Sequence, residues 1–168
     1  ADGVRIDSAD TVAAAAPGTV RLNPFMPPLA SGLPAHCKVA GVINERTGID
    51  GKTYGLGFEI ALPQDWNGRF LFQSGGGLNG SINPPIGASA AGDVPALARG
   101  FAVVSTDGGH KGQAFGASFT VDQRATLDFA HSSVGTVTQV AKKIVAARYG
   151  RLPEHSYLAG RPTSGSEG

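Results

Sequence analysis

Cysteine, net charge and long apolar runs are all scarce in this chain of 168 residues, and each scarcity excludes a class of protein. Cys37 is the only cysteine, so no disulfide can form within the chain. Its thiol is either a small buried apolar group or the partner of a cysteine elsewhere. The formal net charge is +1, and Lys142-Lys143 is the only basic doublet, without interleaved aromatic residues. We therefore expect no nucleic-acid partner.

No apolar stretch approaches the roughly 18 to 20 residues that a membrane-spanning helix needs, so we expect no membrane association. The hydrophobic share of 41% is instead typical of a soluble globular domain with a sizeable core. The sequence starts at Ala1-Asp2 without a methionine, as a mature chain does after loss of a signal peptide and as a recombinant chain can. This start suggests export, and we expect a secreted or periplasmic location.

Proline divides the chain into two parts. Residues 1–35 contain five prolines and little periodicity, which predicts an extended arm without chemistry, laid over a domain formed by residues 36–168. Within that domain, residues 37–43 and 54–62 resemble strands on either side of a turn at residues 48–51. This pattern predicts an antiparallel hairpin.

Two further apolar segments, residues 69–73 and 101–105, predict a strand, a crossover and a second strand. The second segment is apolar throughout, which is typical of a strand buried on both faces in a parallel sheet. In the crossover, Asp93 is a candidate cap for a short helix that continues through Ala98 and stops at Gly100.

A longer helix is predicted between Val121 and Arg148, because apolar residues recur there at intervals of three and four. Gly150 is expected to end this helix, and residues 155–160 predict the next short strand. The apolar stripe of the helix consists of Val134, Val137, Val140, Ala141, Ile144 and Val145.

The glycine-rich segment after residue 73 has three interpretations. Gly75, Gly77 and Gly80 satisfy the G-x-G-x-x-G pattern, and Asp107 closes a later strand where a ribose-binding acid would lie, so a dinucleotide-binding domain is one hypothesis. That fingerprint requires the glycines to open a helix, whereas Asn83-Pro84-Pro85 would stop one. A second hypothesis is a purely structural loop beneath a covering segment.

The third hypothesis is an oxyanion hole, in which backbone N–H groups stabilise the oxygen that gains charge during acyl transfer. Glycine allows such a close approach of the backbone to the substrate. In α/β-hydrolases, one donor lies in the loop after the third strand and another follows the nucleophile. Gly75 and Gly76 follow the third strand counted from His36, so they are the candidate donors.

Several motifs resemble the tannase and feruloyl esterase family of α/β-hydrolases, and the resemblance covers roughly residues 34 to 160. It implies an α/β fold class, namely the N-terminal half of an α/β-hydrolase sheet, with an antiparallel hairpin followed by parallel strands. It also implies an exported enzyme that hydrolyses esters of phenolic acids or monoesters of aromatic diacids. The motifs are Pro34-Ala-His-Cys-Lys-Val39, Phe72-Gln-Ser-Gly-Gly-Gly-Leu-Asn-Gly80, Arg99-Gly-Phe-Ala-Val-Val-Ser-Thr-Asp-Gly-Gly-His110, Asp128-Phe-Ala130 and Arg148-Tyr-Gly150.

The last eight residues depart from the family pattern, in which Gly-Cys-Ser-x-Gly-Gly-Arg-Glu-Gly carries the serine nucleophile and a disulfide cysteine. Pro162 stands at the position of the nucleophile and Arg161 at that of the cysteine. Proline has no hydroxyl group, and its fixed φ does not suit the strained nucleophile elbow. Ser164 and Ser166 are candidate substitutes, or else ordinary loop or helix-cap serines. If the elbow is retained, the N–H of Thr163 would be the second oxyanion donor.

The resemblance places the catalytic acid and histidine after the nucleophile, beyond this chain, together with a lid domain that carries a calcium site. We therefore expect no cofactor in this chain, an aromatic ester as the small-molecule partner, and no esterase activity from the chain alone. The alternative is a non-catalytic fragment or binding chain, either a truncated or decayed hydrolase or one half of an assembly that a second polypeptide completes. The four histidines, which form no helical metal pair, are expected to be structural: His36, His110, His131 and His155.

Overall fold

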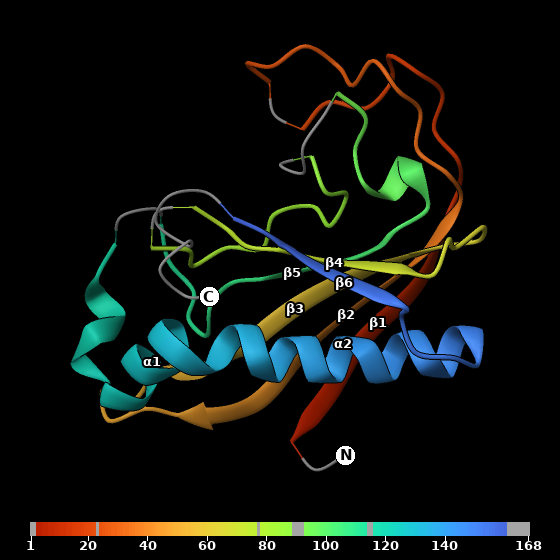
Figure 1. The fold of residues 1–168 in the computed structure, drawn as a ribbon. Coiled ribbons are helices and arrows are strands. Elements are labelled where there is room, and N and C mark those ends of the chain that lie inside the picture. The colour runs from red at the N-terminus through yellow and green to blue at the C-terminus, as the bar shows by residue number, and fades with distance from the viewer. Residues whose placement is uncertain (1–2, 23, 77, 89–92, 114–115, 161–168) are drawn as a thin grey trace.

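A mixed β-sheet forms the centre of the molecule in the computed structural model, which describes residues 3–22, 24–76, 78–88, 93–113 and 116–160 (Figure 1). In this part of the chain the sheet has six strands in the order β1-β2-β3-β5-β4-β6. Their bounds are β1 (Val4–Val12), β2 (His36–Thr47), β3 (Thr53–Pro63), β4 (Arg69–Gln73), β5 (Ala102–Thr106) and β6 (His155–Ala159).

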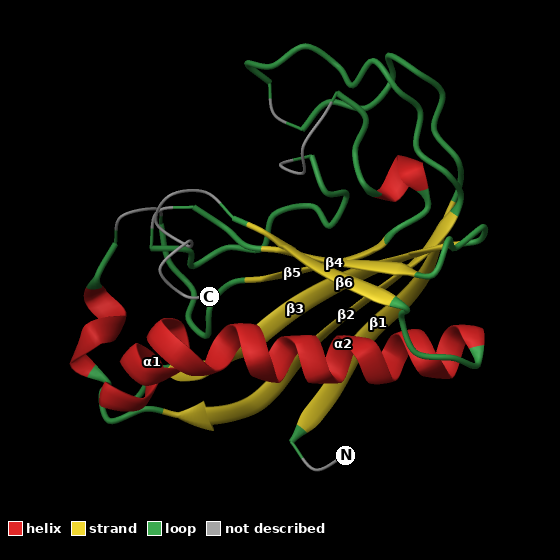
Figure 2. Cartoon of the chain, viewed as in Figure 1, coloured by secondary structure: helices red, strands yellow, loops and turns green. Residues whose placement is uncertain are grey.

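The helical segments are short apart from one long helix, α2, which crosses one face of the sheet (Figure 2). A single 3-10 turn, η1, precedes β5, and a second one, η2, begins a continuous helical region that leads through a π-helical turn into α2. The bounds are η1 (Leu97–Arg99), η2 (Ser118–Val121), α1 (Gln123–Leu127), η3 (Asp128–Ser132) and α2 (Ser133–Tyr149). Among the described residues, none of the helices is both long and apolar enough to span a bilayer.

Strand pairing confirms the predicted α/β fold class. Strands β2 and β3 form the expected antiparallel hairpin, and β5 pairs with β3 in the antiparallel sense. Strand β4 runs parallel to both β5 and β6, so the strand, crossover and strand unit is present. The sheet therefore changes from an antiparallel half to a parallel half at β5.

Alternation along the strands divides the core into two layers. Phe58 and Ile60 of β3 lie on one face with Val137 of α2, whereas Ala61 and the neighbouring Val103 belong to a cluster on the other face. Fully burying one side chain of this size contributes about 1.5–3 kcal/mol, so both layers stabilise the sheet substantially. The long helix uses the predicted stripe, with Val137, Ala141 and Val145 buried and Val134, Val140 and Ile144 partly buried.

The second face is covered by the N-terminal segment and by the crossover between β4 and β5, which both lie on the side of the sheet opposite α2 (Figure 1). Leu22, Leu29 and Leu33 pack there against the cluster that contains Leu71 and Val103. The cover is fixed by backbone hydrogen bonds within the segment, such as the 2.9 Å bond from the N–H of Ala15 to the carbonyl of Leu33.

Strand β1 was not apparent from the sequence, since its residues are mostly polar and exposed. It pairs antiparallel with β2 along the whole strand, with a register shift between Ile6 and Ser8. Backbone hydrogen bonds hold an edge strand of this kind without a requirement for apolar side chains. The segment 1–35 is thus part of the sheet at its beginning and a cover only after Val12.

The crossover helix predicted from Asp93 to Ala98 is wrong in extent, because only the 3-10 turn η1 forms. Its N-cap is Ala96 rather than Asp93, while Gly100 ends it as expected, in a left-handed conformation with φ of 86°. The long predicted helix is interrupted by the π-helical turn η3, and Gly150 ends it with φ of 73°. Cys37, on β2, is a free, half-buried thiol that packs against the core.

Candidate active site

The carboxyl ends of β4, β5 and β6 meet at one edge of the sheet (Figure 1). Gln73 at the end of β4 lies beside Ala159 at the end of β6, and the N–H of Ser74 donates to the carbonyl of Ala159 at 2.8 Å. The glycine-rich loop therefore leaves the sheet directly beside the end of β6. In open α/β sheets this edge is where ligands bind.

Gly75 is buried in that loop, and a side chain there would collide with Asn79, because a Cβ on Gly75 would overlap the Oδ1 atom. The φ angle of Gly75 is not positive, so close approach rather than backbone freedom requires the glycine. Within the described part of the chain, no acceptor is found for the N–H groups of Gly75 and Gly76. Two donors at the ligand-binding edge thus have no acceptor among the described residues.

A second loop, which follows β5, holds the glycine-rich loop in place. The N–H of Gly80 donates to the carbonyl of Asp107 at 3.0 Å, and the N–H of Gly112 donates to the carbonyl of Gly80 at 2.9 Å. Gly108 and Gly109 both have positive φ, at 80° and 101°, which lets the second loop turn tightly beneath the first.

Asp107, the candidate ribose-binding acid, serves this second loop instead. Its Oδ1 accepts the N–H of Gly57 at 3.1 Å and that of Gly109 at 2.9 Å, and the residue is 3% exposed. Burial raises the pKa of Asp107 to about 6, although the two backbone donors act in the opposite direction. No helix follows the glycines in the described residues of 74–88. The described residues therefore supply neither the helix after the glycines nor the ribose-binding acid that the dinucleotide hypothesis needs, since Asp107 accepts backbone N–H groups instead.

His110 fixes the glycine-rich loop, as expected for a structural histidine. Its Nε2 lies 2.9 Å from the carbonyl of Leu78, so Nε2 carries the proton and donates. The ring stacks on Phe119 with centroids 3.7 Å apart and meets Phe129 edge-on at 5.7 Å. Burial lowers the pKa of His110, which favours the neutral ring.

The other three histidines do not belong to a cluster of side chains typical of a catalytic or metal site in the described part of the chain. His36 is held by a 2.8 Å hydrogen bond between its Nδ1 and the carbonyl of Pro34. His131 and His155 are exposed. Within the described ranges, no group of three or more His, Cys, Asp or Glu side chains is arranged to hold a metal ion.

Three buried polar atoms near the glycine-rich loop have no hydrogen-bond partner among the described residues: Ser74 Oγ, Asn79 Nδ2 and His110 Nδ1. Sequence reasoning did not single out Ser74 or Asn79. The Asn79-Gly80 pair was the available signal, because asparagine before glycine favours a turn with positive φ. Asn79 indeed has φ of 41°.

Part of the predicted site lies outside the described residues. This applies to Pro162, Thr163, Ser164 and Ser166, all within 161–168. Of the sequence-predicted site residues, the structure brings Gly75 and Gly76 to the carboxyl edge of the sheet beside the end of β6.

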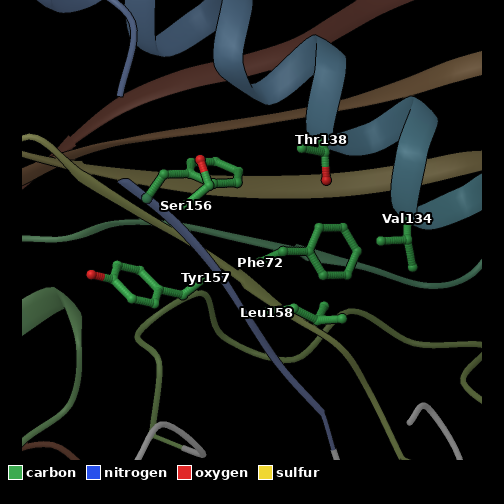
Figure 3. A pocket seen from close by; sticks show the side chains of 7 residues that line it. Phe72, Val134, Thr138, Ser156, Tyr157 and Leu158 are labelled. Carbon is green, nitrogen blue, oxygen red and sulfur yellow. The ribbon is translucent and has the colours of Figure 1, made fainter. Parts of the chain in front are cut away.

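Beneath this edge, on the side of the sheet that carries α2, lies an open apolar cavity of about 180 Å³ (Figure 3). Leu158 of β6 is 48% exposed on this side, and Tyr157, whose ring points to the other face toward Phe101, is 47% exposed, so the outer strand is only partly covered on both faces. In the described part of the chain, β6 pairs only with β4. The cavity is lined by Phe70, Phe72, Val134, Thr138, Ser156, Tyr157 and Leu158.

Several known proteins are similar to this chain in fold and in sequence. Feruloyl esterase B from Aspergillus oryzae superposes on 95% of the chain with a TM-score of 0.72 and 28% identity, and the match covers 29% of that protein. Mono(2-hydroxyethyl) terephthalate hydrolase from Piscinibacter sakaiensis is 42% identical over 147 residues, which are 83% of this chain and 24% of that enzyme. A probable feruloyl esterase B-2 from Aspergillus flavus is 37% identical over 110 residues, covering 66% of this chain and 20% of its own length.

The mixed sheet, with its parallel half and its glycine-rich edge loop, is thus a partial α/β-hydrolase fold. The family model for tannase and feruloyl esterase matches residues 37–168, and the chain belongs to this family. It spans about a quarter of the length of the curated relatives that it matches.

Proposed function

We propose that this chain contributes the oxyanion-binding part of a carboxylic ester hydrolase that acts on esters of aromatic acids. The observation that carries the proposal is the pair of N–H groups of Gly75 and Gly76 beside the end of β6, for which the described part of the chain supplies no acceptor. Donors of this kind stabilise the negative charge that develops on the carbonyl oxygen of an ester during acyl transfer. The relatives named for terephthalate and feruloyl esters support an aromatic acyl group.

The reaction of such an enzyme passes through a serine acyl-enzyme. The hydroxyl of the serine attacks the ester carbonyl, the alcohol leaves, and water then releases the acid. Pro162 cannot act as that nucleophile because it has no hydroxyl. We therefore propose that this chain alone does not hydrolyse esters. If another residue of the final segment replaces the missing nucleophile, the candidates are Ser164 and Ser166.

A second candidate function is a non-catalytic chain whose sheet is completed by another polypeptide. The half-exposed Tyr157 and Leu158 and the apolar cavity beside them favour it, since unpaired strand edges invite association. Size-exclusion chromatography with intact mass analysis of the purified protein separates the two cases, because a second polypeptide would co-elute. We also propose that the protein is secreted or periplasmic and that the chain binds no cofactor of its own.

Titration of the ¹⁵N-labelled protein with methyl ferulate tests the proposed function. Saturable shifts of the Gly75 and Gly76 amide resonances are expected, and a saturated aliphatic methyl ester should cause weaker ones. Shifts caused by NADH in place of the ester would favour the dinucleotide hypothesis. Absence of any shift at the two glycines with either ligand would end the proposal.

A fluorophosphonate probe and p-nitrophenyl acetate test the inactivity of the chain. We expect neither labelling nor hydrolysis above the blank. Covalent labelling at Ser164 or Ser166, mapped by mass spectrometry, would overturn this expectation.

A further inference from the structure

Asn79 occupies an unusual position in the glycine-rich loop. It is one of two described residues other than glycine with positive φ, at 41°, and it is 5% exposed. Asparagine tolerates this conformation better than most side chains, and glycine would adopt it without strain. What distinguishes asparagine from glycine at this position is therefore what its side chain contacts.

Those contacts place the side chain between the two loops at the edge of the sheet. Its Oδ1 lies so close to Gly75 that no Cβ would fit there, and its Nδ2 would be 3.2 Å from a Cβ on Gly108. Asn79 is thus a wedge between the glycine that carries a candidate donor and the loop that follows β5.

The two ends of the glycine-rich loop are fixed by the backbone. The N–H of Ser74 is bonded to Ala159, and the N–H of Gly80 is bonded to Asp107. Between these anchors, no backbone hydrogen bond is found for Gly75 or Gly76 among the described residues. The direction of their N–H groups therefore depends on side-chain packing, and the packing at Gly75 comes from Asn79.

The Nδ2 atom of Asn79 is buried without a hydrogen-bond partner in the described residues. A buried donor without an acceptor destabilises a fold, and in native proteins such groups are often found at functional sites. A stabilising role alone does not account for this residue.

We propose that Asn79 is a positioning residue that sets the orientation of the Gly75 N–H toward the ester oxygen. The proposal rests on the proposed function for its catalytic meaning, whereas the contact with Gly75 can be tested without an ester. Asn79 acts through Gly75.

The chain offers a matched control in Asn44, the other residue with positive φ, at 54°. Its Oδ1 likewise fills the space where a Cβ on Gly3 would lie, but it is exposed and belongs to β2. Asn44→Gly and Asn79→Gly therefore make the same chemical change at the same backbone conformation, in different places.

The first readout is the binding of ferulate, whose carboxylate supplies an oxyanion, because the chain alone is not expected to turn over an ester. In a titration of the ¹⁵N-labelled protein, Asn79→Gly should weaken the affinity for ferulate on the order of 10-fold, since a misplaced N–H no longer donates to the carboxylate oxygen. Asn44→Gly should leave the affinity unchanged. A role in folding alone would instead lower the amount of folded protein without changing the affinity of the folded fraction.

The second readout is the ¹⁵N spectrum of the same variants without any ligand. Asn79→Gly should displace the Gly75 and Gly76 amide resonances, and Asn44→Gly should not. Gly75→Ala approaches the contact from the other side: it should also displace them, and Asn79→Gly should rescue it in the double variant by opening space for the added methyl group.

Unchanged Gly75 and Gly76 resonances in Asn79→Gly, or a double variant no better folded than Gly75→Ala, would overturn the positioning role. If ferulate does not bind at the two glycines, the proposed function fails, and the spectra of the variants without ligand still decide whether Asn79 orients Gly75.

Discussion

Two buried polar clusters lie near the carboxyl edge of the sheet, and they differ in how well their groups are paired. Around Asp122, the carboxylate receives bonds from the Arg46 guanidinium and from the N–H groups of Ile49 and Ala125. Around the glycine-rich loop, Ser74 Oγ, Asn79 Nδ2 and His110 Nδ1 have no partner within the described residues. A buried cluster whose polar groups are all hydrogen-bonded stabilises a fold. Buried polar groups without partners are instead often found at functional sites.

The electrostatics of the two buried aspartates follow the same contrast. The Arg46 guanidinium, together with the N–H of Ala125, holds the pKa of Asp122 well below its usual range. Asp107 has only backbone donors and a distant lysine, and burial raises its pKa to about 6. One carboxylate is stabilised as an anion by a cation, and the other retains a proton more readily than in water.

Removal of the cation from the satisfied cluster should have the largest effect. Arg46→Met leaves the Asp122 charge buried and unpaired, and we expect the melting temperature to fall by about 10 °C. The measurement is circular dichroism during thermal unfolding. Arg5→Met is the control, because its pairs with Asp7 and Glu45 are exposed and should contribute little. Equal effects of the two substitutions would contradict the distinction.

The pH dependence of stability should show both aspartates with opposite signs. Because the folded pKa of Asp107 is about 6 and its ordinary value is 3.8, the free energy of unfolding should fall as pH rises through this window, by about 3 kcal/mol at most. Asp122 acts in the opposite direction, because its lowered pKa contributes stability that is lost as pH falls below its ordinary value of 3.8.

Urea denaturation between about pH 4 and pH 7 measures the Asp107 contribution. Asp107→Asn should remove the decline, while its Oδ1 can still accept both backbone bonds. Asp10→Asn, which changes the net charge equally at an exposed site on β1, should keep it. A decline that persists in Asp107→Asn would assign it to another group.

The smallest effect is expected at His110. His110→Phe preserves the aromatic stacking on Phe119 but removes the donor to the carbonyl of Leu78, which should cost about 1–2 kcal/mol in the free energy of unfolding. The control is His131→Phe, at an exposed position of η3. If His110→Phe were as stable as the wild type, the hydrogen bond would not be what fixes the loop.

The sequence predicted those strands and helices whose stability comes from the burial of their own side chains. The strands 37–43, 54–62, 69–73 and 101–105 were evident because their own side chains are buried in a repeating pattern. Strand β1 was not, because its stability comes from backbone pairing with β2 rather than from its polar side chains. The prediction of a crossover helix was wrong in extent, because the residues after Asp93 form only the 3-10 turn η1.

The candidate site was predictable only in outline. Gly75 and Gly76 were assigned from the count of strands, which depends on topology alone. The wedge formed by Asn79 depends on a contact with Gly75 and on the approach of a loop about 30 residues away in sequence. Contacts of this kind arise from folding and leave no periodic pattern.

Residue-resolved amide hydrogen exchange tests most directly whether Gly75 and Gly76 present free donors to a ligand. In the protein alone, the account predicts protected amides at Ser74 and Gly80, which bond to Ala159 and Asp107, and unprotected amides at the two glycines between them. Saturating ferulate, whose carboxylate supplies an oxyanion, should then slow exchange at Gly75 and Gly76. Glycine amides already as protected as their neighbours without ligand, and unchanged by it, would contradict the account.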